Sequence, residues 1–392
     1  MTTEEEPARA AFYNDPKVRG IFYQLVLFAL VVWLGYEFVV NARDNLRAAK
    51  IATGFGFLDN TAGFSISQTL ISYTESDSYG RVFVVGLLNT LLIAVIGIVL
   101  TSILGFLVGL ARLSANWLLQ RLAGAYVETI RNIPLLLQIL FWYLAVLSAL
   151  PAPRQSISIF GEAFVNNRGL VLPQPVFGEG AWLVVAALVA GILLAVAVRM
   201  WARRRQEATG RQFPVLWTAL ALIVGVPLVA SLATGFPISF EKPVLRGFNF
   251  VGGVRVIPEF VALLIALVTY TAAFIAEIVR AGVLAVSHGQ TEAAYSLGLR
   301  PGHTLRLVVV PQALRVIIPP LTSQYLNLTK NSSLAVGIGY PDLFAVFAGT
   351  TLNQTGQAIE IIAITMAVYL TISLVTSLLM NLYNARVRLV ER

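Results

Sequence analysis

Long stretches without a single charged residue constrain this 392-residue chain more than any other feature. A helix needs about 20 mostly apolar residues to cross the hydrocarbon core of a bilayer. Charged residues make up only 12% of the chain, against roughly 25% in soluble domains. We therefore expect an all-α integral membrane protein. The stretches that lack Asp, Glu, Lys and Arg are residues 82–111, 133–150, 181–198, 213–240, 260–276 and 361–385, and residues 20–40 contain only Glu37.

The apolar pattern predicts about eight transmembrane helices, so both termini should lie on the same side of the membrane. If that side is the cytoplasm, eighteen Lys and Arg residues lie inside and nine outside, as the positive-inside rule requires. The net charge of +8 then reflects topology, and we expect no nucleic-acid partner. The predicted helices are 20–40, 83–111, 125–148, 181–199, 215–236, 258–279, 317–349 and 358–384.

The sequence argues against several other classes of function. It has no cysteine, so we expect no disulfide framework and no thiolate metal or redox site. We also expect no other metal site. No small-residue cleavage site follows residues 20–40, which should therefore remain as a membrane helix. No Gly-x-x-x-x-Gly-Lys-Ser/Thr loop is present, so this chain should not hydrolyse nucleotide itself. No nucleophile–base set stands out, and we expect no enzyme.

The polar segment 287–311 separates two of the predicted membrane helices. Ser287 and Gln290 have the spacing of a capping box, which predicts a helix start. Gly298 permits the positive φ that ends a helix, and Pro301 suits the first turn of the next one. Taken alone, this segment would be an ordinary loop between two membrane helices.

Five residues of this segment give it a family resemblance. Its pattern resembles the "EAA loop" of ABC importer permeases, which docks on a separate ATPase and couples it to the membrane helices. The resemblance implies that segment 287–311 is a coupling loop. The small alanines would allow another protein's backbone to approach closely. The matching residues are Glu292, Ala293, Ala294, Gly298 and Pro311.

A second stretch, residues 128–138, resembles amino-acid permeases of the same family. Its pattern is Glu-x-x-Arg-x-x-Pro-Leu-x-x-Gln. Glu128 and Arg131 have the i, i+3 spacing of a helical ion pair, and Pro134 should kink the helix one turn later. We expect a structural role for these three residues rather than contact with substrate.

The predicted helix 317–349 carries more polar groups than a lipid-facing helix tolerates. These groups should face a partner helix or a water-filled cavity, and Lys330 is the one full charge deep in a span. It could meet a substrate carboxylate. The alternatives are that Lys330 snorkels to an interface and that the polar stripe holds two permease subunits together. The candidate pathway residues are Thr322, Asn327, Lys330, Asn331 and Ser332.

The resemblance divides the chain into three parts. Residues 1–82 would form a tail, the first membrane helix and a long periplasmic segment, and residues 385–392 a cytoplasmic tail. Residues 83–384 resemble the type-1 ABC transmembrane domain, with helices inserted at about 151–257. The outer segment 41–81 is either a platform for an external binding protein or a structured loop over the helix ends. These additions are typical of the larger permease of general L-amino-acid importers of the Aap/Bzt type.

That family implies a complete importer in the bacterial inner membrane. Its partners would be a second homologous permease in a heterodimer, two ATPase subunits that bind ATP and magnesium, and a periplasmic amino-acid-binding protein. This chain would then bind no cofactor and would move amino acids into the cytoplasm by alternating access. The alternative is a gradient-driven secondary carrier or channel for small polar solutes. Carriers usually need carboxylates inside the membrane, and these are scarce here.

Overall fold

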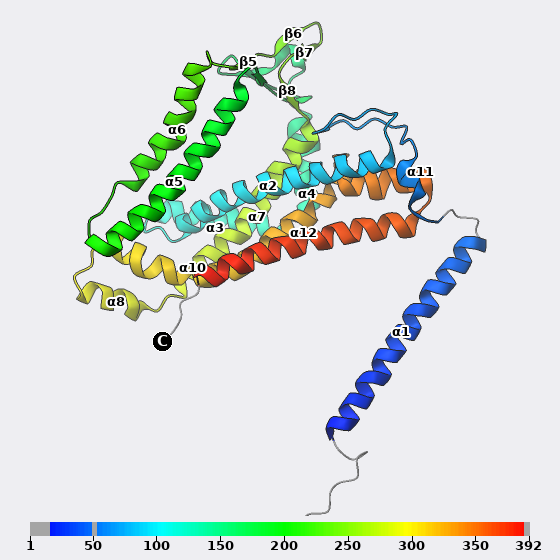
Figure 1. Ribbon diagram of the computed structural model, residues 1–392, viewed down its shortest axis with the longest axis horizontal. Coiled ribbons are helices and arrows are strands. Elements are labelled where there is room, and N and C mark those ends of the chain that lie inside the picture. Colours follow the sequence, from blue (N-terminus) through cyan, green and yellow to red (C-terminus); the bar gives the residue numbers. More distant parts are fainter. Residues whose placement is uncertain (1–15, 49–52, 388–392) are drawn as a thin grey trace, which may run out of the picture.

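The protein is helical throughout its membrane region in the computed structural model, which describes residues 16–48 and 53–387 (Figure 1). Within these residues, seven helices are long and apolar enough to cross a membrane, or eight if one bent pair counts as a span. The prediction of about eight helices is confirmed. The long helices are α1 Pro16–Ala48, α2 Tyr79–Arg112, α5 Ala181–Thr209, α6 Val215–Ala233, α7 Pro258–Leu284, α10 Val310–Asn331 and α12 Ala358–Val387. Of the predicted tails, residues 1–15 and 388–392 lie outside the described residues, whereas residues 385–387 continue α12.

Helices α2 and α7 form the centre of the core and touch through glycines. A Cβ atom at Gly105 would lie 2.6 Å from the Cβ of Ile275, and one at Gly109 would lie 2.7 Å from the Cβ of Val279. The two glycines are four residues apart, a spacing that lets membrane helices approach closely. Lipid tails are as apolar as the side chains, so the hydrophobic effect does not hold two membrane helices together. Close van der Waals packing at these glycines stabilises the pair instead.

The predicted single helix 125–148 is wrong in shape. The chain instead forms α3 Trp117–Asn132, then α4 Leu135–Leu140 and the π-helix η3 Phe141–Leu147, with a bend of 105° between the two parts. Ile133 is extended, with φ −97° and ψ 127°. A proline forces its preceding residue out of the helical region. Pro134 therefore breaks the helix with a sharp bend instead of kinking it.

The predicted helix 317–349 is also wrong at both ends. The helical segment begins at Pro301 and ends at Ile338, because Gly339 adopts a φ of 76° that stops it. After a short turn the chain forms the π-helix η7 Phe344–Thr351 and the short helix α11 Leu352–Thr355. The 7 residues before Gly339 form the 3₁₀ helix η6, Ser332–Ile338.

The outer segment between α1 and α2 covers the ends of the core helices. Its 3₁₀ turn η2, Phe55–Asp59, buries Phe57 against Tyr79 and Phe347. The N–H of Gly54 donates to Oε1 of Glu360 over 2.7 Å, which fastens the segment to the start of α12. The segment is therefore structured and lies over the helix ends, and its role as a platform for an external binding protein stays a prediction.

The inserted region contains the two predicted helices and eight short strands that the sequence pattern did not predict. Helices α5 and α6 form a hairpin beside the core (Figure 1) and meet at Gly191, where a Cβ would lie 2.5 Å from the carbonyl oxygen of Leu222. The antiparallel sheets have the orders β1-β2-β3-β8, β4-β5 and β6-β7. The strands are β1 Ile157–Ile159, β2 Ala163–Asn166, β3 Gly169–Leu172, β4 Gln174–Phe177, β5 Ile238–Glu241, β6 Val244–Arg246, β7 Asn249–Val251 and β8 Val254–Val256.

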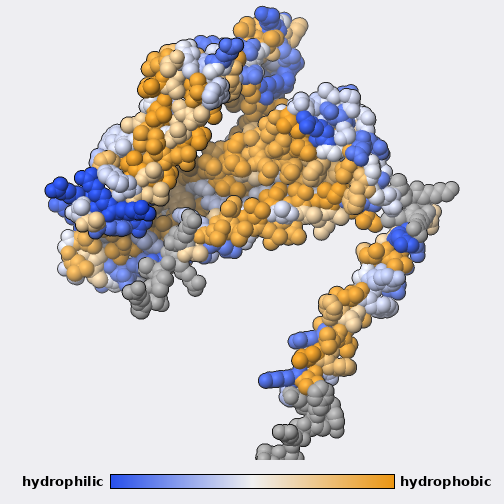
Figure 2. Space-filling view, viewed as in Figure 1, coloured by the Kyte–Doolittle hydropathy of each residue, from blue (hydrophilic) through white to orange (hydrophobic). Residues whose placement is uncertain are grey.

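Hydrophobic side chains cover the long flanks of the helices that face away from the core. Figure 2 shows this surface over α2, α5, α6 and α12, with hydrophilic residues gathered at the strand-rich end and around the α5–α6 turn. None of the residues of α6 is buried. A surface of this kind is suited to lipid or to other membrane helices and not to water.

Candidate functional site

The predicted coupling loop is a short helix, a tight turn and a second helix start. Helix α8, His288–Ser296, follows closely on α7, and α9, Pro301–Thr304, leads through the π-helical turn η5, Leu305–Val309, into α10. Pro301 is the first residue of α9, as predicted, where its missing N–H leaves no helix hydrogen bond unmade. The loop therefore joins the ends of α7 and α10.

Gly298 ends α8 in the way that the sequence predicts, with a φ of 78°. The N–H of Leu299 donates to the carbonyl of Ala294 over 3.1 Å, and the N–H of Gly298 donates to that of Tyr295 over 2.9 Å. This is the Schellman arrangement, in which glycine supplies the left-handed residue. The turn therefore depends on a residue without a Cβ.

The predicted capping box between Ser287 and Gln290 is wrong. Ser287 precedes the first residue of α8, but its side chain makes no capping hydrogen bond. The side chain of Gln290 instead accepts a hydrogen bond from Nε2 of Gln312 on α10, over 3.2 Å. A partner distant in sequence has replaced the local cap, and the contact fastens α8 to α10.

The three residues of the Glu-Ala-Ala motif have different surroundings. Glu292 is exposed, and its Oε1 lies 3.0 Å from Nδ1 of His288 on the preceding turn. Ala293 is exposed, whereas Ala294 is buried, with 4% of its surface accessible. Ala294 thus packs within this chain, and only Glu292 and Ala293 of the motif are open to a partner.

One exposed residue of the loop, Leu297, was not predicted from the sequence as a contact for a partner. Leu297 is 83% exposed beside the turn at Gly298, and Tyr295 is also exposed. The signal was an apolar residue next to a helix-ending glycine in an otherwise polar loop. Together with Ala293, these side chains give the loop an accessible apolar surface. Pro311 is the second residue of α10 and is half-buried.

The predicted pairing of Glu128 with Arg131 is not formed, although both residues are described. The guanidinium of Arg131 lies 4.8 Å from the ring centroid of Phe274 on α7, a cation–π distance. Arg131 therefore binds the end of α3 to α7. The ring outcompetes a local ion pair because Glu128 is exposed to solvent.

The bend at Pro134 is held by Gln138 from the same stretch. Its Nε2 lies 2.9 Å from the carbonyl oxygens of both Ile130 and Ile133, and it donates to them. A proline leaves carbonyls of the preceding turn without a helical donor. Gln138 is buried and supplies that donor to two carbonyls, which stabilises the sharp turn.

The five candidate pathway residues do not share one environment. Asn327 and Lys330 are exposed, and Thr322 and Asn331 are half-buried. Ser332 is fully buried, and its hydroxyl donates to the carbonyl of Thr329 over 2.8 Å. Asn327 and Lys330 are therefore the members of the set that are most accessible on this chain alone.

Lys330 lies at the edge of a cavity of about 360 Å³ between α10, η7 and α12. Phe344, Ile362 and Met366 make its wall mostly apolar, while Ser333 and Tyr369 add hydroxyl groups. Lys330 is itself exposed, so its ammonium is accessible at this cavity.

A buried polar cluster that the sequence did not reveal lies next to this cavity. Asp342 is fully buried, and its Oδ1 accepts a hydrogen bond from the N–H of Ala345 over 2.8 Å. The hydroxyl of Tyr369 donates to Oδ2 over 3.4 Å. Burial raises the pKa of Asp342 from its ordinary 3.8 to about 7. Asp342 lies in the connection between two spans, two residues before η7 begins.

Acidic and histidine side chains are dispersed over the protein. Within residues 16–48 and 53–387, no three of them gather closely enough to hold a metal ion. Both histidines, His288 and His303, lie in the coupling loop.

Comparison with known proteins gives consistent matches over the chain. Residues 208–389 match the family described as binding-protein-dependent transport system inner membrane component. The general L-amino acid transport system permease protein AapQ of Rhizobium johnstonii is 54% identical over 98% of this chain and 96% of its own length. The putative amino-acid ABC transporter permease protein YhdX of Escherichia coli is 55% identical over 97% of both chains.

A third relative extends over the full length of both proteins. The glutamate/glutamine/aspartate/asparagine transport system permease protein BztB of Rhodobacter capsulatus is 44% identical over 100% of each chain. With these identities and coverages, the chain belongs to the permease proteins of amino-acid ABC transporters and has their mostly helical, multi-pass type-1 fold.

Proposed function

We propose that this chain is the permease subunit of an ATP-driven importer that carries amino acids from the periplasm to the cytoplasm by alternating access. The membrane would be the bacterial inner membrane. The observation that carries the proposal is the position of α8. It lies between the ends of α7 and α10 and presents Glu292, Ala293 and Leu297 to a partner.

The coupling loop suits the transmission of force because it is attached at both ends and along its length. It continues into α7 on one side and through η5 into α10 on the other. Gln290 is hydrogen-bonded to Gln312, and a buried cluster joins α7 to α10 through Ile275, Val279 and Ile317. Displacement of α8 should therefore move α7 and α10 together, since packed helices shift as units.

ATP hydrolysis would occur on two separate ATPase subunits, which would hold ATP and magnesium. This chain has no phosphate-binding loop, and so needs an external source of energy. The accessible side of α8 offers a carboxylate and an apolar patch, which is the combination of charge and anchor side chain that an interface uses. ATPase closure against this surface would open the membrane helices outward.

The substrate pathway would pass the exposed part of α10. Every amino acid carries an α-carboxylate, and Lys330 at the edge of its cavity would attract that group. Thr322, Asn327 and Asn331 would supply weaker polar contacts, and Ser332 would stabilise the helix end behind them. The relatives' names fit this class of substrate, since AapQ is called a general L-amino acid permease and BztB a permease for glutamate, glutamine, aspartate and asparagine.

Two further partners are part of the proposal. A second homologous permease would cover part of the exposed apolar surface, giving a heterodimer with the pathway between the two chains. A periplasmic amino-acid-binding protein would dock on the outer segment between α1 and α2 and on the strand-rich region. The outer segment is well packed, with Phe57 and Ala62 buried, so it would present a fixed surface.

The decisive experiment measures amino-acid uptake into proteoliposomes that contain the complete complex. Glu292→Lys and Gly298→Asp should abolish uptake and remove the stimulation of ATPase activity by loaded binding protein. Glu207→Lys, on the exposed end of α5, is the matched control and should retain both. Capture of amino acid by the binding protein itself should be unchanged in all variants.

The same preparation separates the proposal from a gradient-driven carrier. Uptake should require ATP inside the compartment that faces α8 and should persist when ionophores remove ion gradients. Uptake that follows an imposed proton or sodium gradient without nucleotide would overturn the proposed function.

A further inference from the structure

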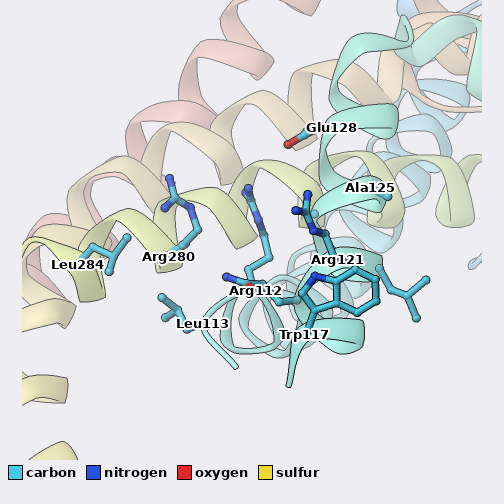
Figure 3. A pocket seen from close by; sticks show the side chains of 11 residues that line it. Arg112, Leu113, Trp117, Arg121, Ala125, Glu128, Arg280 and Leu284 are labelled. Carbon is cyan, nitrogen blue, oxygen red and sulfur yellow. The ribbon is translucent and has the colours of Figure 1, made fainter. Parts of the chain in front are cut away.

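A cavity of about 880 Å³ opens where α2 ends, α3 begins and α7 approaches its own end (Figure 3). Three arginines line it, one from each helix: Arg112, Arg121 and Arg280. Figure 3 shows their side chains next to one another, with Trp117 beside Arg121. None of the contacts proposed for transport uses this cavity.

The arginines of the cavity outnumber the carboxylates near them. Glu277 bonds to both Arg112 and Arg280, the latter over 2.6 Å between Oε1 and Nη2. Glu128 lines the cavity and is exposed. Arg121 is also exposed and, among the described residues, is in no ion pair. Three guanidiniums thus face two carboxylates, and an excess positive charge remains with free donors.

The cavity lies at the level where membrane hydrocarbon should give way to lipid headgroups. Arg112 directly follows the charge-free stretch of α2. Helix α3 begins at Trp117 and exposes a row of apolar side chains, among them Trp117 and Leu122, while its opposite face buries Ala123 and Val127. Tryptophan is enriched at membrane interfaces. The arginines belong to the side that the positive-inside rule assigns to the cytoplasm.

We propose that this cavity binds the phosphate headgroup of an anionic phospholipid from the cytoplasmic leaflet. Guanidinium groups bind phosphate oxygens in a bidentate manner, and basic pockets between membrane helices bind acidic headgroups. The acyl chains would lie along the apolar face of α3. Arg121 supplies the free guanidinium, and Arg112 and Arg280 supply further donors while remaining held by Glu277.

The bound lipid would also support the coupling loop. Leu284 lines the same cavity and is the last residue of α7, only four residues before α8 begins. A lipid in this place would hold the ends of α2 and α7 together. This consequence rests on the proposed function, whereas lipid binding itself does not.

The test measures lipid bound to the complete transporter complex in nanodiscs. Nanodiscs of phosphatidylcholine are supplemented with a small fraction of labelled phosphatidylglycerol or, in a separate arm, labelled phosphatidylcholine. Phosphatidylglycerol should bind saturably, and Arg121→Gln should weaken its binding about tenfold. Arg121→Lys should retain most of it. Arg204→Gln, on the exposed end of α5, is the matched control and should bind as the unmodified complex does.

A further arm adds inorganic phosphate at millimolar concentration, to separate a lipid site from a site for free phosphate. The proposal requires that phosphate leave most of the labelled phosphatidylglycerol in place. Equal binding by Arg121→Gln and the unmodified complex would overturn it. Full displacement of the lipid by phosphate would also overturn the proposal. So would equal binding of phosphatidylcholine, or the absence of saturable binding because a partner subunit covers the cavity.

Discussion

Gly282 of α7 lies so close to Ile317 of α10 that a Cβ atom at position 282 would be 2.3 Å from Cγ1 of the isoleucine. Both residues are buried, and they lie near the helix ends that the coupling loop joins. The two helices are thus packed so closely at this point that neither can slide past the other without opening the contact. The pair therefore makes α7 and α10 one mechanical unit.

Gly282→Ala should separate the two helices and impair transport. Overpacking of this kind costs about 1–3 kcal/mol, which should lower the thermal midpoint of the purified complex and reduce uptake. Adding Ile317→Ala to the same chain should recover part of both losses, because it removes the clashing atoms. Gly225→Ala in α6, where the added methyl group has open space around it, is the control. Loss without recovery in the double variant would argue against a steric cause.

The turn at Gly298 should be sensitive to backbone conformation alone. A Cβ at this position would meet no atom within 4 Å, so only the φ of 78° opposes a side chain. Alanine there should cost about 1–2 kcal/mol and fray the end of α8, whereas asparagine tolerates the left-handed region and should cost less. We expect uptake to follow the order glycine, asparagine, alanine at unchanged expression. Equal activity of the two variants would exclude this explanation.

The outcome at Gly298 and Pro301 illustrates which features a sequence determines locally. Positive φ and a missing N–H act within one turn, so their positions were predictable. Pro134 was located correctly but its effect was not, because the size of the bend depends on Gln138 and on packing against α7. The eight strands were missed since each has only three or four residues.

Contacts between distant residues could not be predicted from one sequence. The bond of Gln290 to Gln312 replaced an expected local cap, and Phe274 replaced Glu128 as the partner of Arg131. In each case, the tertiary contact replaced the nearest neighbour in sequence. The membrane helices themselves were predictable because their lengths and polarity are fixed by the bilayer.

Leu297 should be an anchor for the partner of the coupling loop. An exposed leucine loses its contact with water when an interface covers it, and full burial of such a side chain is worth about 1.5–3 kcal/mol. Leu297→Ala should weaken co-purification of the ATPase subunits, and Leu297→Glu should abolish it. Gln206→Glu on the exposed end of α5 is expected to have no effect. Normal ATPase recovery with Leu297→Glu would place the interface elsewhere.

Asp342 should make the stability of the complex depend on pH. Because burial raises its pKa from 3.8 to about 7, the folded protein binds this proton more tightly than the unfolded chain. Its effect on stability is therefore most favourable below pH 4 and is lost as pH rises towards 7, by at most about 1.4 kcal/mol per unit. Asp342→Asn keeps an acceptor for Ala345 and cannot ionise.

Thermal unfolding of the complex between pH 5 and pH 8 tests this dependence. The midpoint of the unmodified protein should fall over this range more than that of Asp342→Asn. Asp59→Asn is a suitable control, since Asp59 is exposed and its replacement should leave the pH profile unchanged. Parallel profiles for the unmodified protein and Asp342→Asn would mean that Asp342 does not titrate in this range.

Lys330 should affect transport through its charge. If its ammonium attracts the α-carboxylate, Lys330→Gln should raise the substrate concentration for half-maximal uptake several-fold, while Lys330→Arg should have a smaller effect. The effect should be similar for glutamate, glutamine and a neutral aliphatic amino acid, because the α-carboxylate is common to all three. Lys17→Gln removes an exposed lysine at the start of α1 and should leave uptake unchanged. A defect confined to acidic substrates would instead assign Lys330 to side-chain selection, and an unchanged concentration dependence would remove it from the pathway.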